Sequence, residues 1–489
     1  MYYIGIDLGT SAVKLLLMDE KGSILNIVSK EYPLSFPNPG WSEQNPEDWM
    51  KQSIEGIKEL TQGIDRSKIG GISSGGQMHG LVMLDKEDRV IRPAILWNDG
   101  RTGEETDYLN QVIGKDVLSQ HTANIAFAGF TAPKILWVKK NEPENFEKIS
   151  KIMLPKDYLT YMLSGAFASD YSDASGMLLM DVKNKCWSKE MVDICGISLE
   201  QLPTLYESFD VVGSLKPEVA DELGMNVDVK VIAGAGDNAA AAVGTGTVGA
   251  GRCNISLGTS GTIFISSDRF GVDENNALHS FAHADGNYHL MGCMLSAASC
   301  NKWWMEEILG RKDFQEEQEK IQDLGENKVF FLPYLMGERS PHNNPKARAT
   351  FTGMTMDTTQ TDMYQAVLEG VAFALRDSFE IAKKLGIKIE RSKISGGGAK
   401  SPLWKKIIAN VLNIKIDVIE SEEGPALGAA ILAAVGCQEY PDVKTAADSF
   451  VHITDTIEPD EELAAKYEQR YQEFKEIYPS LIDVFNRIN

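Results

Sequence analysis

Two copies of one short motif constrain this chain more than any other feature. Asp7-Leu-Gly-Thr-Ser11 near the start and Ser256-Leu-Gly-Thr-Ser260 in the second half share Leu-Gly-Thr-Ser between apolar, β-prone runs. Each copy predicts a tight β-hairpin. Backbone N–H groups and hydroxyls at such a tip suit an oxyanion such as phosphate. One copy alone is equally typical of an ordinary edge hairpin, but two copies predict duplicated domains that face each other across a nucleotide.

The two copies differ at the residue before the shared leucine. Asp7 stands in the first copy where Ser256 stands in the second, so only the first hairpin carries a carboxylate. A carboxylate beside a phosphate-binding turn can hold the divalent ion that accompanies a nucleoside triphosphate. The alternative is that Asp7 and Thr10 only cap the turn. The asymmetry predicts different roles for the two hairpins.

Length and composition narrow the class of protein. A chain of 489 residues is expected to form two or three domains, and its alternating strands and helices indicate an α/β fold. A formal charge of −22 argues against nucleic acid or an anionic membrane as the main partner. The six cysteines include no CxxC pair, and we see neither a signal peptide nor an apolar run long enough to span a bilayer. We therefore expect a cytoplasmic protein.

Asp237 is the most informative single residue. An apolar strand over residues 229–233 ends at glycines, and an Ala-rich helix then begins with Asp237 and Asn238. Sheets of α/β proteins build active sites at such strand ends. We expect the helix dipole to keep the pKa of Asp237 low, although such a carboxylate can still act as base when the proton leaves late in phosphoryl transfer. The alternative is a plain helix N-cap, but the neighbouring glycines leave room for a ligand and favour function.

Two further glycine-bounded loops are candidates for ligand binding. Gln77-Met78-His79 follows a short predicted strand, where His79 could hydrogen-bond a polyol hydroxyl beside an apolar wall from Met78. Ser395-Gly-Gly-Gly-Ala399 lies between a strand and a helix, where glycines let the backbone approach a flat ring or a phosphate. Neither loop is specific by itself. Asp170 and Asp173 are metal ligands by residue type, but their setting favours a turn and a helix cap.

Taken together, these motifs resemble the FGGY family of carbohydrate kinases. The likeness extends to Gly129–Trp137, and to Ala349–Met354 followed by Asp362–Glu369, which match the two signatures of that family. It implies an α/β fold of two actin-like, ribonuclease-H-like ATPase domains with a cleft between them. We expect an N-terminal domain over residues 1–245 and a C-terminal domain over 246–489, with a peripheral helix from about residue 460.

The resemblance also implies an activity. The implied reaction transfers the γ-phosphoryl group of ATP, with Mg²⁺, to the 5-hydroxyl of a ketopentose, and D-xylulose is the expected substrate. The alternatives are another ketose or polyol (L-xylulose, ribulose or gluconate), or a non-catalytic nucleotide-binding protein of the actin and Hsp70 type. The partners are then a small-molecule sugar and ATP, and the likeness allows a homodimer.

By match to the family pattern, Asp237 is the base and Asp7, the second catalytic residue, organises the metal and the phosphates. The sugar-binding residues implied are Met78, His79, Asp237 and Asn238. The nucleotide-binding residues implied are Gly9, Thr10, Lys14, Gly258, Thr259, Gly397, Gly398 and Ala399.

Overall fold

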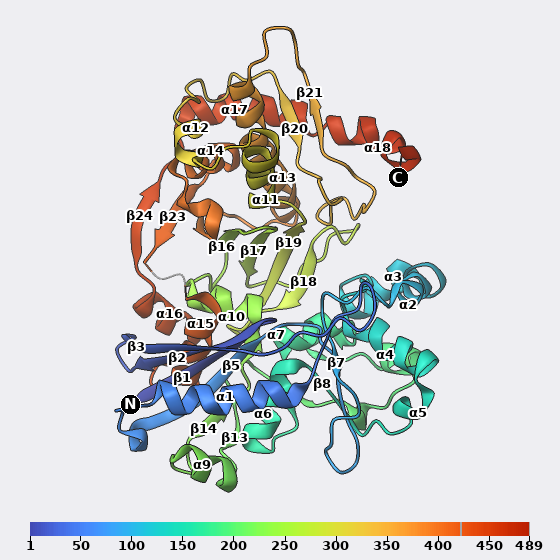
Figure 1. Cartoon of the computed structure of the whole chain (residues 1–489), viewed down its shortest axis with the longest axis vertical. Helices are drawn as coiled ribbons and strands as arrows, with labels where there is room; N and C mark the ends of the chain where they lie inside the picture. Colours follow the sequence, from blue (N-terminus) through green and yellow to red (C-terminus); the bar gives the residue numbers. More distant parts are fainter. Residues whose placement is uncertain (421–422, 489) are drawn as a thin grey trace.

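The computed structural model describes residues 1–420 and 423–488, which form two lobes that each contain a seven-stranded sheet (Figure 1). The N-lobe sheet has the order β13-β14-β5-β1-β2-β3, with β15 beside β5. The C-lobe sheet has the order β18-β19-β17-β16-β22-β23-β24. The strands are β1 (Tyr2–Leu8), β2 (Ala12–Asp19), β3 (Ile24–Glu31), β5 (Ile69–Gly76), β13 (Val211–Ser214), β14 (Lys230–Ile232), β15 (Ala235–Gly236), β16 (Arg252–Leu257), β17 (Gly261–Ser267), β18 (His279–Ala282), β19 (Tyr288–Met294), β22 (Arg391–Ser395), β23 (Lys415–Ile419) and β24 (Ile453–Ile457).

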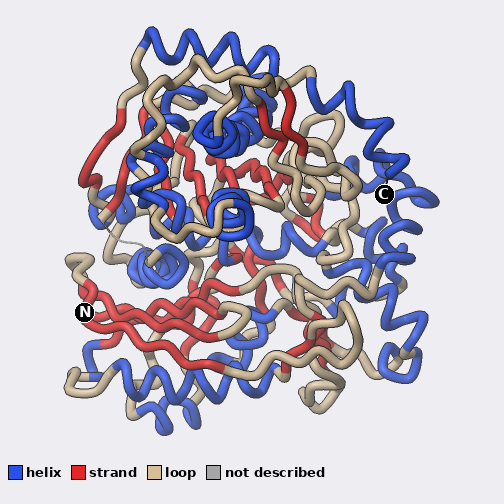
Figure 2. The backbone as a smooth tube through the Cα atoms, turned by 45° about the horizontal axis from the view of Figure 1, so that its top comes forward, coloured by secondary structure: helices blue, strands red, loops and turns tan. Residues whose placement is uncertain are grey.

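The two sheets repeat one topology. In the N-lobe, β1 pairs antiparallel with β2 and β2 with β3, while β1 pairs parallel with β5 and β5 with β14. In the C-lobe, β16, β17, β19, β22 and β23 repeat these relations in the same order. Figure 2 shows the strands as two separate groups, one in each lobe. The predicted duplicated α/β fold is confirmed.

The helices that cover the sheets begin at capping residues that can be recognised in the sequence. In α1 (Pro46–Leu60), the Asn45 side chain accepts from Glu47 N and proline takes the first position, as helix N-termini favour. The long α13 (Gln360–Lys384) begins with a capping box of Thr359 and Asp362. It packs against α14 (Pro402–Leu412) and the C-lobe sheet.

The remaining elements are mostly short. The N-lobe adds α2 (Gly103–Asp107), α3 (Lys115–Thr122), α4 (Thr131–Asn141), α5 (Pro143–Phe146), α6 (Pro155–Ser164), α7 (Tyr171–Ala174), α8 (Lys189–Cys195), α9 (Pro217–Leu223), β4 (Glu43–Gln44), β6 (Val82–Leu84), β7 (Ala94–Ile95), β8 (Lys151–Met153), β9 (Ala168–Asp170), β10 (Met180–Asp181), β11 (Cys186–Trp187) and β12 (Thr204–Tyr206). The C-lobe adds α11 (Ala298–Trp303), α12 (Phe314–Gln318), α16 (Val443–Phe450), β20 (Phe330–Leu332) and β21 (Thr350–Thr352).

Two helices join the lobes, and one of them lies against the sheet of the other lobe. α15 (Gly424–Gly436) follows a C-lobe strand but packs on β1 and β5 and against α10 (Asp237–Gly244). Figure 1 places both helices between the two sheets. A Cβ added at Gly5 would lie 2.0 Å from Ala426 O, and one at Gly428 would lie 1.8 Å from Ala240 O. Glycine is therefore needed for this backbone-to-backbone contact between the lobes.

The C-terminal segment differs from the expected single peripheral helix. It forms two helices, α17 (Glu461–Phe474) and α18 (Ile477–Ile488). One face of α17 packs on the C-lobe, where Tyr467 is fully buried and Arg470 pairs with the buried Glu369 at 2.7 Å. Apolar and aromatic residues at helical spacing lie on one face of α17, and this face packs against the C-lobe core. No helix within the described ranges is long and apolar enough to cross a membrane.

Candidate active site

The two predicted catalytic carboxylates lie at the same edge of the N-lobe sheet. Asp7 is the last residue but one of β1, and Asp237 directly follows β15 and begins α10. Strand β5 separates the two, because its Gly75 pairs with Asp7 and its Gly76 with Gly236. The carboxyl ends of parallel strands meet at one edge of a sheet, and active sites of α/β proteins lie there. Residues 230 positions apart in the chain are thereby brought into one site.

The protonation of Asp237 is not what its helix position predicts. Burial, reinforced by the negative charge of Asp7, raises the pKa of Asp237 to about 7, and a 2.7 Å hydrogen bond from Asn238 N opposes this only in part. The expected low pKa is therefore wrong, because desolvation and a second carboxylate outweigh the helix dipole. The N-cap alternative is also wrong, since Gly236 occupies the N-cap and Asp237 is the first helical residue.

Asp7 has a similar environment with one compensating charge. Burial raises its pKa to about 6, although the charge of Lys14 lowers it. Lys14 is the cross-strand neighbour of Asp7 in the hairpin, and its Nζ also lies 2.9 Å from Glu423 Oε2 near the start of α15. The lysine therefore links the first hairpin to a helix contributed by the second half of the chain.

The pair of carboxylates fits a divalent cation brought by a nucleotide. Magnesium is usually held by one or two carboxylates together with substrate phosphates, rather than by a complete protein cage. The described residues contain no cluster of three or more His, Cys, Asp or Glu side chains that could hold a metal. The negative charge of Asp7 contributes to the raised pKa of Asp237, and a divalent cation held by Asp7 would offset that charge.

The tip of the first hairpin is held rigidly by side chains from three other segments. The Tyr32 hydroxyl donates to Gly9 O, and Gln44 Nε2 donates to Thr10 O at 2.5 Å. Trp97 Nε1 donates to Thr10 Oγ1 at 2.9 Å. These bonds fix the orientation of the turn that the sequence predicts to bind phosphate.

Of the predicted sugar-binding residues, Asn238 contacts both Asp237 and Met78, and His79 follows Met78 in the chain. Asn238 Nδ2 lies 3.0 Å from Asp237 Oδ1 and 3.8 Å from Met78 Sδ. His79 Nδ1 lies 2.7 Å from Gly176 O, and since a carbonyl only accepts, Nδ1 carries the proton and Nε2 is an acceptor. Burial lowers the pKa of His79 to about 3, so the ring is neutral.

A buried charge network lies behind Asp237 and was not found from the sequence. Lys156 is fully buried, and its Nζ lies 2.8 Å from Asp157, 3.0 Å from Asp170 and 3.1 Å from Ala233 O. Although burial opposes the charged form, these carboxylates raise the pKa of Lys156. Asp170 accepts from Ser172 Oγ, which in turn accepts from the backbone N of Gly236 at 3.1 Å. The network fixes both ends of the turn that leads into Asp237.

The same network accounts for Asp170, one of the two aspartates that are metal ligands by residue type, whereas neither carboxylate oxygen of the buried Asp173 has a hydrogen-bond partner among the described residues. Asp170 caps α7 by accepting from Ser172 N at 2.8 Å, so the predicted helix cap is confirmed. Nothing local in the sequence indicates that Lys156 is buried, because a lysine at the start of a helix is normally exposed.

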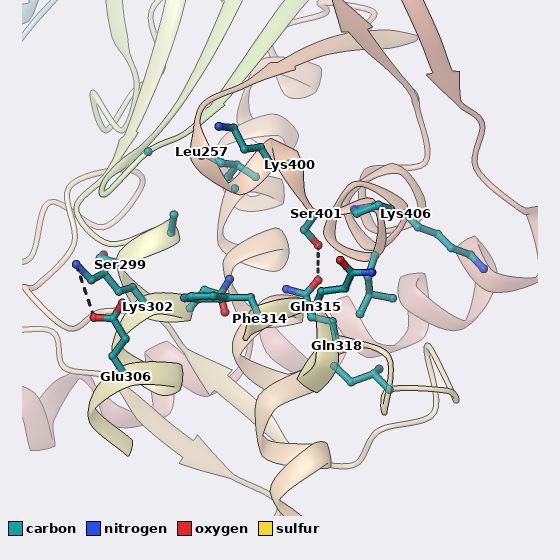
Figure 3. A pocket seen from close by; sticks show the side chains of 18 of the residues that line it. Leu257, Ser299, Lys302, Glu306, Phe314, Gln315, Gln318, Lys400, Ser401 and Lys406 are labelled. Carbon is teal, nitrogen blue, oxygen red and sulfur yellow. Dashed lines mark hydrogen bonds and ion pairs between the residues drawn. The ribbon is translucent and has the colours of Figure 1, made fainter. Parts of the chain in front are cut away.

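A cavity of about 1310 Å³ lies in the C-lobe (Figure 3). Among its lining residues are Gly258 and Thr259 from the second hairpin and Gly397 and Gly398 from the turn after β22, whereas Ala399 is not among them. The first-hairpin and sugar-binding candidates lie outside it, on the N-lobe. The sequence did not single out several other lining residues, namely Ser299, Lys302, Glu306, Phe314, Gln318, Lys400, Ser401 and Lys406.

Side-chain contacts shape this cavity. Figure 3 shows Ser401 Oγ donating to Gln318 Oε1, at 2.6 Å, and Lys302 beside Glu306, at 3.7 Å. Phe314 and Gln318 belong to α12, which lies in a stretch without a recognisable ligand-binding pattern. Only its helix start, with Asp313 as N-cap, is readable in the sequence.

The fold is a two-domain α/β fold of the actin-like ATPase type, with two sheets of one topology and two glycine-turn hairpins. A carboxylate pair lies at one sheet edge, and a large cavity lies beside the second hairpin. The profile described as "FGGY family of carbohydrate kinases, N-terminal domain" matches residues 2–244, and the corresponding C-terminal-domain profile matches residues 253–437. The chain belongs to the FGGY family of carbohydrate kinases.

Individual relatives are similar over the whole chain. The xylulose kinase of Escherichia coli (strain K12) is 41% identical over 484 residues, which cover 98% of this chain and 99% of that protein. A crystal structure described as a xyloylose kinase from Brucella ovis superposes with a TM-score of 0.94 at 40% identity, over 99% of this chain and 100% of that one. The gluconate kinase from Lactobacillus acidophilus also reaches a TM-score of 0.94, at 28% identity, over 100% of this chain and 99% of that one.

Proposed function

We propose that this chain transfers the γ-phosphoryl group of ATP to the 5-hydroxyl of D-xylulose and releases D-xylulose 5-phosphate and ADP. The observation that carries the proposal is Asp237, a carboxylate with a pKa of about 7 beside Asp7 at the carboxyl edge of the N-lobe sheet. A group with this pKa accepts a proton near neutral pH. The choice of D-xylulose rests on the whole-length similarity to xylulose kinases.

In this proposal the N-lobe holds the sugar. Asp237 accepts the proton of the reacting hydroxyl, and the neutral His79 accepts a hydrogen bond from another hydroxyl through Nε2. Asn238, whose amide already contacts Asp237, orients the same end of the sugar, and Met78 forms the apolar wall. Positioning of this kind supplies a large part of the catalysis of phosphoryl transfer, which involves little covalent chemistry by the protein.

The nucleotide is proposed to lie between the two hairpins. Gly258 and Thr259, with Gly397, Gly398 and the neighbouring Ala399, approach the adenosine and phosphates from the C-lobe, and Gly9, Thr10 and Lys14 approach the phosphates from the N-lobe. Asp7 would hold Mg²⁺, which would neutralise charge on the β- and γ-phosphates.

We assign the domains to residues 1–245 and 246–489. A cytoplasmic location and a homodimer remain part of the proposal, and light scattering of the purified protein tests the dimer.

A second candidate substrate follows from one comparison. The gluconate kinase of Lactobacillus acidophilus shares the whole fold, so the same scaffold holds sugars of different chemistry. Stereochemical choice among gluconate, L-xylulose and ribulose depends on a few hydroxyl contacts, each of which contributes strongly to discrimination when the protein partner is buried.

An ADP-release assay across these sugars tests the proposal. We expect D-xylulose to give the highest kcat/KM, at least tenfold above L-xylulose, ribulose and gluconate, with loss of activity on removal of Mg²⁺. Mass spectrometry and NMR of the product should place the phosphate on O5. A higher kcat/KM for gluconate would transfer the assignment to the second candidate, and ADP release without dependence on any sugar would contradict a sugar kinase.

A further inference from the structure

Arg339 is held in place on a C-lobe loop by bonds on both sides of it. The preceding Glu338 accepts through Oε1 from Leu295 N, at 2.9 Å, and from Arg339 N, at 2.8 Å. The following Ser340 donates from its backbone N to Cys293 O at 2.9 Å and accepts through Oγ from Cys293 N at 3.0 Å. The loop is therefore fastened to the end of β19, and the Arg339 backbone has a fixed position.

The Arg339 side chain reaches across to the N-lobe. Its guanidinium carbon lies 4.8 Å from the centre of the Phe127 ring, which belongs to the segment before α4. Phe127 lies 5.4 Å from Phe130, and Phe130 lies 4.6 Å from His79, measured between ring centres. The guanidinium therefore caps a row of rings that ends at the candidate sugar ligand His79.

Arg339 carries a charge without a carboxylate partner among the described residues. The adjacent Glu338 directs Oε1 to backbone N–H groups, and burial raises its pKa to about 8, so it is mostly neutral near pH 7. The thiol of Cys293 is a weak acceptor beside the guanidinium. By contrast, Arg101, Arg391 and Arg470 are each paired with an acidic side chain. A half-buried guanidinium whose donors are not taken by a carboxylate is available to a ligand that supplies oxygen acceptors.

We propose that Arg339 is a substrate-contacting residue of the C-lobe, whose guanidinium donates hydrogen bonds to oxygens of the sugar held by His79 and Asn238. The proposal rests on the proposed sugar-kinase function. It makes the sugar a bridge between the lobes, since His79 and Asn238 belong to the N-lobe and Arg339 belongs to the lobe that contains the large cavity. Binding of sugar then favours the arrangement in which the two lobes meet, because only that arrangement uses both sets of contacts.

Three variants test the role of Arg339. Arg339→Met keeps the length of the side chain but removes all donors, and Arg339→Lys keeps the charge without the planar fork. Arg348→Met is the matched control, because Arg348 lies on the same loop and its guanidinium donates to the carbonyls of Pro345 and Ala347. Initial rates are measured with varied sugar at saturating ATP and with varied ATP at saturating sugar, and sugar-free ATP hydrolysis is measured separately.

We expect Arg339→Met to raise the KM for sugar about 10- to 100-fold, the effect of losing charge-assisted hydrogen bonds. Arg339→Lys should give a smaller increase. The KM for ATP and the rate of sugar-free hydrolysis should stay within twofold, and Arg348→Met should match the wild type throughout. If Arg339→Met does not fold, sugar-induced thermal shifts of Arg339→Lys provide the same comparison.

An unchanged KM for sugar in both Arg339 variants would overturn the proposal, as would an increase confined to the KM for ATP. Failure of the proposed function is recognised separately, in the wild type. If the wild-type enzyme prefers gluconate or another sugar to D-xylulose, the variants are measured with that sugar, and the same changes in KM decide the role of Arg339.

Discussion

At the residue scale, the proposed chemistry depends on the protonation of Asp237. Burial and the charge of Asp7 bring its pKa to about 7, whereas a carboxylate at a helix start would ordinarily be fully ionised. A base with this pKa is well matched to a hydroxyl at neutral pH. Replacing Asp237 by Asn should lower kcat about 10²- to 10⁴-fold while ATP affinity, measured by calorimetry, stays within a fewfold. Retention of more than a tenth of wild-type turnover would contradict its role as base.

The raised pKa of Asp237 also predicts a pH dependence. In the wild type, kcat/KM for sugar should fall as pH drops below about 7, because protonated Asp237 cannot accept the proton. The folded protein holds this proton up to a higher pH than the unfolded chain does. The free energy of unfolding should therefore decrease as pH rises from about 4 to about 7. Asp237→Asn removes this pH-dependent contribution to the free energy of unfolding. The Tm of the variant should therefore exceed that of the wild type at pH 8 and approach it at pH 5. An equal difference in Tm at both pH values would contradict the assignment.

At the scale of elements, the position of Asp237 is determined by α6, β9 and α7, three segments remote from it in sequence. Lys156 at the start of α6 is the counter-charge for Asp157 and for Asp170 at the end of β9, and Ser172 in α7 contacts the backbone at Gly236. Lys156→Met leaves buried carboxylates unpaired and should cost about 3–5 kcal/mol of unfolding free energy. Lys140→Met, which breaks an exposed pair with Glu104, should cost no more than about 0.5 kcal/mol. Similar losses from the two variants in denaturant titrations would contradict the network.

Ser172 separates the positioning effect from the stabilising effect. Ser172→Ala removes the acceptor for Gly236 N but leaves Lys156 paired with Asp157. We expect a loss of about 1 kcal/mol of unfolding free energy together with a lower kcat, since the turn before Asp237 loses one of its constraints.

At the scale of the whole molecule, α10 and α15 decide how the lobes meet. A methyl group at Gly428 would overlap Ala240 O at 1.8 Å, so Gly428→Ala must push the two helices apart. We expect a stability loss of about 1–3 kcal/mol and a lower kcat, because under the proposed function the N-lobe carboxylates would no longer be aligned with a nucleotide bound by the C-lobe. Gly103→Ala is the matched control, since a methyl group there meets open space. An unchanged Tm and kcat in Gly428→Ala would show that the contact is not tight.

Much of the fold and part of the site could be predicted from the sequence because their signals are local. The two Leu-Gly-Thr-Ser hairpins, the strand before Asp237 and the caps of α1 and α13 depend on residues close together in the chain. Asp7, Met78, His79 and Asn238 were singled out for the same reason, as polar or apolar groups at glycine-bounded turns. The structure brings Asp7, Met78 and Asn238 close to Asp237 at one edge of the N-lobe sheet, and His79 follows Met78 in the chain.

The tertiary structure decided what depends on contacts between distant segments. The pKa of Asp237 is set by burial and by Asp7, 230 positions away, and so could not follow from a helix dipole. No local pattern indicates the burial of Lys156 or the position of Phe314 at the cavity, and α15 packs on the sheet of the other lobe. The sequence by itself determined the duplicated fold and the residue types at its turns, because these arise from local backbone preferences. Only the tertiary structure determined charge, burial and the meeting of the lobes, because desolvation and Coulomb interactions depend on distance in space.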